Sequence, residues 1–202
     1  MKINSNNYIN FQKKLVATSK VGDVGARQKV SIYELDKFSD RADLDRLYMT
    51  STWDKSYYVE EINDEFAKKF FTPLGQDSHF YIMENSQKEP ICVSVLNKAN
   101  RKKNQLDYLE TAHSYSTYGD GTRRVRYIGE TMLAFLVKMT KKEDKNFEVP
   151  DVAQREKTKA FYFDHCGFKQ IGDRVAYLKK KNFKSFLSLN KSHTGSKIKI
   201  SL

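Results

Sequence analysis

Long apolar runs are missing from this 202-residue chain, although 39% of its residues are hydrophobic. The longest such stretch, residues 128–139, is interrupted by Glu130, Thr131 and Lys138. A membrane-spanning helix needs roughly 20 consecutive apolar residues, so none is expected. Residues 1–10 contain no apolar segment of the kind found in signal peptides. These absences predict a globular cytoplasmic protein without a membrane partner.

Cysteine is scarce, since only Cys92 and Cys166 are present and they lie far apart in the sequence. Two such residues form neither a disulfide framework nor a zinc pattern. The histidines also lack metal-ligand spacing; they are His79, His113, His165 and His193. The sequence therefore predicts a reducing, intracellular setting and no metal site.

Acidic residues are missing from the C-terminal end. Residues 174–202 contain eight Lys or Arg and no Asp or Glu, and the net charge of the whole chain is +11. We therefore interpret residues 183–202 as a basic tail. Such a tail favours contact with nucleic acid electrostatically. A solvated, solubilising tail explains the same composition, and both interpretations stay open.

The middle of the chain has the pattern of one mixed α/β domain. Residues 1–27 are polar and are interpreted as an N-terminal extension with at most a short helix at 11–16, and residues 28–182 as the domain. Alternating or β-rich runs predict strands at 30–35, 79–84, 91–97, 105–115, 147–152, 168–171 and 175–178. Helical spacing predicts helices starting near Ser39 and spanning 57–70, 128–139 and 154–165. This order is typical of one sheet with helices packed against it.

One stretch follows a predicted strand and leads into the predicted helix at 128–139. A helix start presents free backbone N–H groups and the positive end of the dipole, which together favour an anion. Arginine adds a forked donor group, and glycine allows close approach of the backbone. The spacing alone equally fits an ordinary helix start. The residues of this loop are Arg126, Tyr127, Ile128, Gly129, Glu130 and Thr131.

A second segment, Lys-Ala-Phe-Tyr-Phe-Asp-His-Cys-Gly-Phe at 159–168, is an aromatic helix that ends in Gly-Phe before a strand. Together the two segments resemble the GNAT superfamily of acetyl-CoA-dependent N-acetyltransferases over residues 30–181. In that family a Gln/Arg-x-x-Gly-x-Gly/Ala loop opens the central helix. The resemblance implies a mixed, mostly antiparallel central sheet flanked by helices. It also implies that amides of residues 126–131 bind the pyrophosphate of acetyl-CoA and that the strand at 105–114 runs beside the pantetheine arm.

The sequence departs from the family pattern at two places in this region. Thr131 stands where the family usually has Gly or Ala, so its side chain is expected either to crowd the loop or to donate to phosphate. Residues 116–124 make the passage from the strand to the loop unusually long.

The catalytic residues are less clearly marked. Acetyl transfer to an amine needs a base for the amine and an acid for the departing thiolate. The family acid is commonly a tyrosine four residues before the glycine, where this chain has Phe163. Tyr162, one position earlier, points about 100° away on an ideal helix and serves only if the helix is locally bulged; otherwise it is a packed aromatic residue. The candidate bases are Glu110, which has family precedent, and His113, which has the more suitable ordinary pKa.

The function implied is transfer of an acetyl group from acetyl-CoA, used as co-substrate, to an amine acceptor of unknown identity. Trp53, Tyr57 and Tyr58 are expected either in the acceptor site or in the core. The alternative function is a GNAT-like scaffold without catalysis that binds nucleic acid or protein. The absence of tyrosine at position 163 and the basic tail both favour that alternative.

Overall fold

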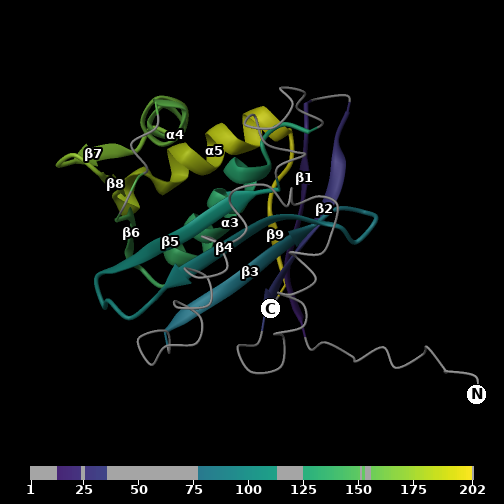
Figure 1. Ribbon diagram of the computed structural model, residues 1–202, viewed down its shortest axis with the longest axis horizontal. Helices are drawn as coiled ribbons and strands as arrows, with labels where there is room; N and C mark the ends of the chain where they lie inside the picture. The colour runs from purple at the N-terminus through teal and green to yellow at the C-terminus, as the bar shows by residue number, and fades with distance from the viewer. Residues whose placement is uncertain are drawn as a thin grey trace, which may run out of the picture.

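The structure is a computed structural model that describes residues 13–23, 26–35, 77–112, 125–150, 152 and 156–201. These residues form one nine-stranded sheet with the strand order β7-β8-β6-β5-β4-β3-β2-β1-β9 (Figure 1). The strands are β1 (Lys14–Val21), β2 (Gln28–Leu35), β3 (Ser78–Glu84), β4 (Pro90–Asn97), β5 (Lys103–Thr111), β6 (Asn146–Val149), β7 (Lys169–Ile171), β8 (Val175–Leu178) and β9 (Lys199–Ile200). The helices are α3 (Ile128–Lys142), α4 (Glu156–Ala160), the π-helical turn η3 (Phe161–His165), the 3-10 turn η4 (Lys180–Asn182) and α5 (Phe183–Thr194).

The centre of the sheet is the antiparallel meander β3-β4-β5, as the sequence predicted. Phe80 lies opposite Val95, and Ile82 lies opposite Val93, so that apolar side chains line up across the strands. The adjoining strand β6 pairs with β5 in the parallel direction, whereas every other described pair is antiparallel. The predicted mixed, mostly antiparallel sheet is therefore confirmed.

The described part of the expected extension, residues 13–23 and 26–27, belongs to the domain. Residues 14–21, part of which were expected to be helical, form β1, which pairs with β2 from Lys14–Glu34 to Val21–Gln28. Val16, Ala17 and Val21 are buried in the main core, which explains why this polar segment is held in the sheet. Gly22 makes the turn at φ +97, where a Cβ would lie 2.7 Å from the carbonyl oxygen of Ala26. The expected domain boundary at residue 27 is thus wrong.

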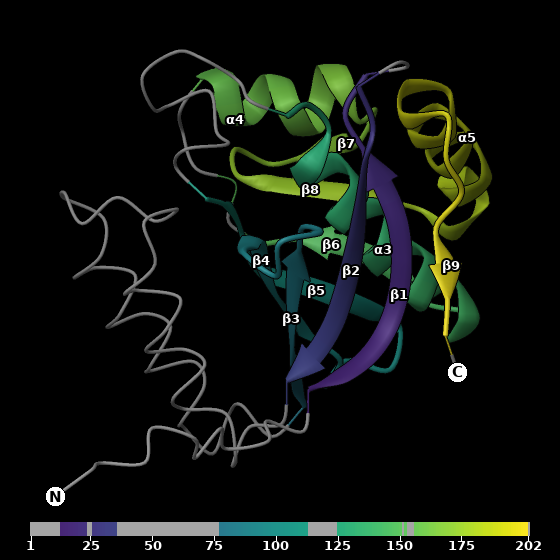
Figure 2. The ribbon, with the colours of Figure 1, turned by 90° about the vertical axis from the view of Figure 1, so that its right-hand side faces the viewer.

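The C-terminal segment is also part of the domain, against the prediction of a tail beginning at residue 183. Phe183 and Phe186 lie on one face of α5 and are buried in the main core together with Ile198. Figure 2 shows α5 beside α3, and β9 along the outer edge of β1. The basic residues of this segment, among them Lys184, Lys191 and Lys197, lie on its exposed side.

The remaining predicted elements divide into confirmed ones and untested ones. The predicted helix at 128–139 corresponds to α3, and the predicted helix at 154–165 corresponds to α4 and η3. The helices predicted from Ser39 and at 57–70 lie outside the described residues, as do Trp53, Tyr57, Tyr58 and the passage at 116–124. No helix of the described part is long and apolar enough to cross a membrane.

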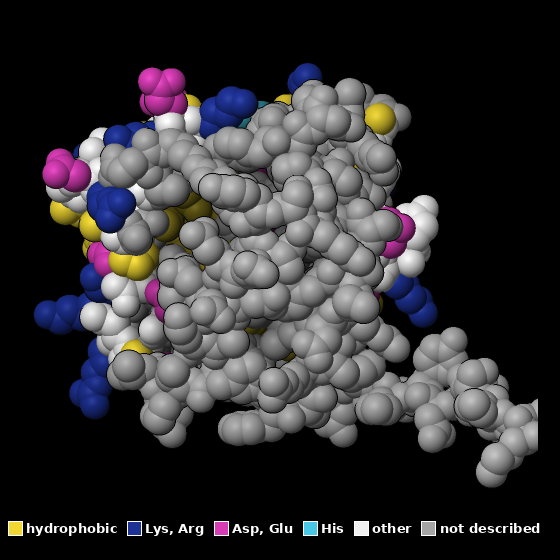
Figure 3. Space-filling view, in the orientation of Figure 1, with side chains coloured by type: hydrophobic (Ala, Val, Ile, Leu, Met, Phe, Trp, Pro, Cys, Tyr) yellow, Lys and Arg dark blue, Asp and Glu magenta, His cyan; other side chains and the backbone are white. Residues whose placement is uncertain are grey.

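Figure 3 shows one face of the molecule, with Lys and Arg side chains of the described residues in dark blue. Lys and Arg side chains project there at separate points around the margin of the molecule. Contact with nucleic acid through the lysines of α5 and β9 stays a prediction.

Candidate functional site

The start of α3 has no side-chain cap. Tyr127 is the residue before the helix and has a left-handed backbone with φ 66, and no side chain caps the helix. The first turn of a helix leaves its N–H groups without intrahelical partners. The Thr131 N–H closes the first turn on the Tyr127 carbonyl at 2.9 Å. The N–H groups of Ile128, Gly129 and Glu130 therefore point out of the helix start, where the dipole favours an anion.

The turn between β1 and β2 holds this loop in place. The Gly22 N–H donates to the Arg126 carbonyl at 2.9 Å. Asp23 lies 3.6 Å from the Arg126 guanidinium, and both side chains are more than half exposed. An exposed pair of this kind contributes little to stability, so Arg126 is free to exchange Asp23 for an anionic ligand.

The loop side chains divide between the core and the surface. Ile128 and Thr131 are buried, and the Asn190 side chain of α5 lies 3.5 Å from the Thr131 hydroxyl. The Thr131 hydroxyl thus has a neighbour on α5, and its expected effect on the phosphate site stays a prediction. A Cβ on Gly129 would make only ordinary contacts, at 3.4 Å to Thr111 Oγ1 and 3.8 Å to Phe161 Cζ.

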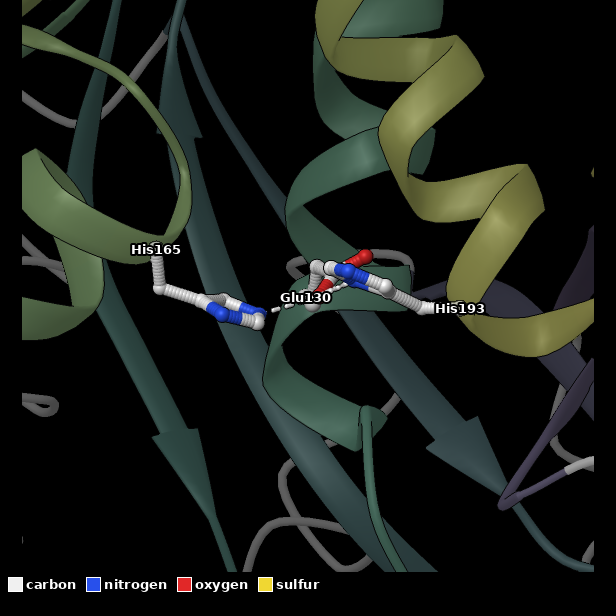
Figure 4. A group of neighbouring side chains, drawn as sticks. All are labelled: Glu130, His165 and His193. Atoms are coloured by element: carbon white, nitrogen blue, oxygen red, sulfur yellow. Dashed lines mark hydrogen bonds and ion pairs between the residues drawn. The ribbon is translucent and has the colours of Figure 1, made fainter.

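Glu130 turns inward and is the centre of a cluster that joins three helical elements (Figure 4). Its Oε2 lies 2.5 Å from His165 Nε2, at the end of η3, and 2.9 Å from His193 Nδ1, on α5. Asn190 donates to the other carboxylate oxygen at 2.9 Å. The Tyr127 ring stacks on the His193 ring with the centroids 5.0 Å apart. The side chains at the helix start are therefore fixed by α5.

Tyr162 lies within the π-helical turn η3. A π-turn inserts one residue and changes which side chains face the core, so the helix is bulged at this point. The Tyr162 side chain is 6% exposed and packs between Phe161 and Phe168. Burial raises the pKa of the Tyr162 hydroxyl, with smaller contributions from Cys166 and Cys92. The phenol therefore keeps its proton at neutral pH.

Glu110 lies on β5 opposite Val93, on the face of the sheet that carries the second apolar cluster. Burial raises the pKa of the Glu110 carboxyl to about 7. The Tyr108 hydroxyl, two residues earlier on the same face, donates to Glu110. A carboxylate with this pKa can accept a proton near neutral pH.

The predicted site residues are only partly brought together. Residues 126–131 lie together at the start of α3, with 128–131 inside its first turn, and Gly129 and Glu130 approach η3 through Phe161 and His165. Tyr162 belongs to the main apolar cluster, whereas Glu110 lies opposite Val93 of the second cluster. His113 lies outside the described residues. Sequence reasoning missed Asp23, Asn190 and His193, because each reaches the loop from an element that had been assigned to an extension or a tail.

No family model matches the sequence, and no curated protein matches it. Structures of AtaTR, SpeG and KacT are among the solved structures that match in fold. AtaTR bound with AcCoA is 15% identical, and the match covers 77% of this chain and 96% of that chain with a TM-score of 0.52. Mutant forms of the spermidine/spermine N-acetyltransferase SpeG from Vibrio cholerae are 12% identical, with 77% and 98% covered and a TM-score of 0.51. A mutant of KacT is 14% identical, with 78% and 98% covered and a TM-score of 0.50.

The likeness to these structures concerns the fold. The chain shares the fold of structures that include the N-acetyltransferase SpeG, which agrees with the fold implied by the resemblance of its two motifs.

Proposed function

We propose that this protein is an N-acetyltransferase that transfers the acetyl group of acetyl-CoA to an amine. The observation that carries the proposal is the uncapped start of α3 beside Arg126, within a GNAT fold. Three outward N–H groups, the helix dipole and a guanidinium form a site for the pyrophosphate of acetyl-CoA. AtaTR, which shares the fold, has been crystallised with AcCoA.

The chemistry assigned to the chain needs a base and an acid. Glu110 is the proposed base, because its raised pKa of about 7 suits proton transfer from an amine or a bridging water. Tyr162 is the proposed acid, which would protonate the departing thiolate of CoA. The π-turn supports this role, since Tyr162 was expected to serve only if the helix is bulged.

The cofactor site is tested by replacing Gly129. We expect Gly129→Glu to weaken acetyl-CoA binding by more than about 100-fold, because a carboxylate would stand among the N–H groups that receive the pyrophosphate. Isothermal titration calorimetry with purified wild type and variant measures the difference. Binding of acetyl-CoA by Gly129→Glu with the wild-type affinity would remove this loop as the pyrophosphate site.

Gly129→Ala is the matched control. Its Cβ meets Thr111 and Phe161 at ordinary contact distances of 3.4 and 3.8 Å, so the fold accommodates it. We expect its affinity for acetyl-CoA to stay within about 10-fold of the wild type. Equal losses in both variants would indicate that local packing, and not charge, causes the effect.

Tyr162→Phe tests the proposed acid. The substitution removes only the hydroxyl from a ring packed between Phe161 and Phe168, so the melting temperature should change little. We expect kcat to fall by about 10²-fold, because the thiolate loses its proton donor. Release of the CoA thiol, measured with a panel of amines, provides the rate. An unchanged kcat would leave Tyr162 as a packing residue and assign the proton to another group.

A further inference from the structure

The cluster around Glu130 has features that the proposed acetyl transfer does not use. The Glu130 side chain is 1% exposed, yet it carries a carboxylate. A buried carboxylate is costly unless a cation or several hydrogen bonds compensate it. Within the described residues no Lys or Arg forms an ion pair with Glu130. The ionisable groups that meet it there are the imidazoles of His165 and His193.

The donor atoms of this cluster suit a transition metal. One carboxylate oxygen and one nitrogen from each imidazole lie within 4.8 Å of one another. Two His and one Glu with an open fourth position form the ligand set of many zinc sites. The His165 and His193 side chains are 39% and 25% exposed, so an ion and a water ligand can reach the cluster from solvent.

The surroundings of the cluster resemble the outer shell of a metal site. Asn190 donates to Glu130 Oε1 at 2.9 Å and leaves Oε2 facing both imidazoles. Partners of this kind orient a ligating carboxylate. The rings are also held in place, since Tyr127 stacks on both imidazoles and Phe161 stacks on His165. The three donors thus come from α3, η3 and α5, and stacking contacts support the two rings.

We propose that Glu130 Oε2, His165 Nε2 and His193 Nδ1 bind one divalent transition-metal ion of the zinc class. Zinc lies about 2.0–2.2 Å from each such donor, which requires the donors to be roughly 3 Å apart or slightly more. The present separations of 2.5 Å and 2.9 Å from Glu130 Oε2 require the rings to draw back by less than about 1 Å. The ion would link α5 to the start of α3 and neutralise the Glu130 carboxylate beside the anion-binding loop.

Zinc binding by the full-length protein tests the proposal without acetyl-CoA, so its outcome is independent of the proposed acetyl transfer. The protein is stripped with a chelator, dialysed, and titrated with Zn²⁺ in competition with a chromophoric chelator. We expect one equivalent to bind with a Kd below about 1 μM. His165→Ala and His193→Ala should each weaken binding by more than about 100-fold, and Asn190→Ala by about 10- to 100-fold.

His79→Ala is the matched control, because His79 Nδ1 also pairs with a carboxylate oxygen, Glu34 Oε1, at 2.6 Å. Within the described residues, this pair does not belong to a cluster of three metal donors. Its zinc affinity should equal that of the wild type. Cys166→Ser excludes the neighbouring thiol, which is 2% exposed and should not contribute. Circular dichroism establishes that each variant is folded.

Two results would overturn the proposal. One is a wild-type protein that binds no zinc at micromolar concentrations. The other is a folded His165→Ala or His193→Ala variant with wild-type zinc affinity. Either result would leave the cluster as a hydrogen-bond network that joins α5 to α3.

Discussion

Deletion of residues 183–202 should unfold the domain. The deletion removes Phe183, Phe186 and Ile198 from the main core, and each large apolar side chain contributes about 1.5–3 kcal/mol when buried. It also removes Asn190 and His193, which would leave the Glu130 carboxylate without two of its partners. These losses together are comparable with the whole stability of a domain, about 5–15 kcal/mol. We expect the truncated chain to lack a cooperative melting transition in circular dichroism.

Smaller changes in α5 separate packing from charge. Phe183→Ala should lower the free energy of unfolding by about 3–5 kcal/mol, since the ring is buried and leaves a cavity. The double variant Lys184→Gln/Lys191→Gln changes only exposed side chains and should stay within about 0.5 kcal/mol of the wild type per substitution. A truncated protein that melts cooperatively at the wild-type temperature would show that α5 is an accessory element.

The central part of the fold was predictable from local patterns. The strands that became β3, β4 and β5 alternate or are continuously apolar, and the stripe of α3 repeats at helical spacing. Those patterns predict burial, because the side chains that they place inward are the ones packed in the core.

The two ends of the chain were misassigned because composition outweighed spacing. Helical intervals separate Phe183, Phe186, Leu187 and Asn190, but the basic residues of the whole segment, among them Lys184 and Lys191, suggested a solvated tail. β1 contains Thr18, Ser19 and Lys20, which weakened its alternation. Its place in the sheet depends on pairing with β2 and β9, and pairing partners are not visible in a local window.

The cluster at Glu130 could not be predicted for a different reason. Its histidines are 35 and 63 residues from the carboxylate, so no local spacing connects them. Histidine spacing indicates a metal site only when the ligands lie on one helix or in one short loop. Here three helical elements bring the donors together, and one of them, α5, had been interpreted as part of a tail.

Glu110→Gln should lower kcat for acetyl transfer by about 10²- to 10⁴-fold, if Glu110 is the base as we propose. A base acts in its deprotonated form. Since burial raises the pKa of Glu110 to about 7, the wild-type rate should rise with pH up to about 7 and then level off. The rate of CoA thiol release, measured from pH 5 to 9, gives the pH–rate profile. Its rising limb below about pH 7 should be absent from the profile of Glu110→Gln.

Three variants distinguish Glu110 from other groups. Tyr108→Phe removes a donor to the carboxylate, which disfavours the charged form and should move the limb to higher pH. Glu148→Gln, on the neighbouring strand β6, changes a carboxylate that pairs with Lys103 at 2.6 Å and should leave the limb unchanged. If His113→Ala abolishes the limb while Glu110→Gln retains it, His113 is the base.

The raised pKa of Glu110 can also be tested through protein stability, without an amine acceptor. The pKa of Glu110 is about 7 in the folded protein and about 4.5 ordinarily, so between these values the folded state binds more protons than the unfolded state. Stability therefore decreases as the pH rises from about 4.5 to 7, and above 7 the ionised carboxylate destabilises the fold. Glu110→Gln removes this cost and should be more stable than the wild type at pH 8 by on the order of 1 kcal/mol, but not at pH 4. Urea unfolding at both pH values measures the difference in the free energy of unfolding between Glu110→Gln and the wild type. An equal difference at pH 4 and pH 8 would contradict a raised pKa of Glu110. It would also contradict the assignment of Glu110 as a base that titrates near pH 7.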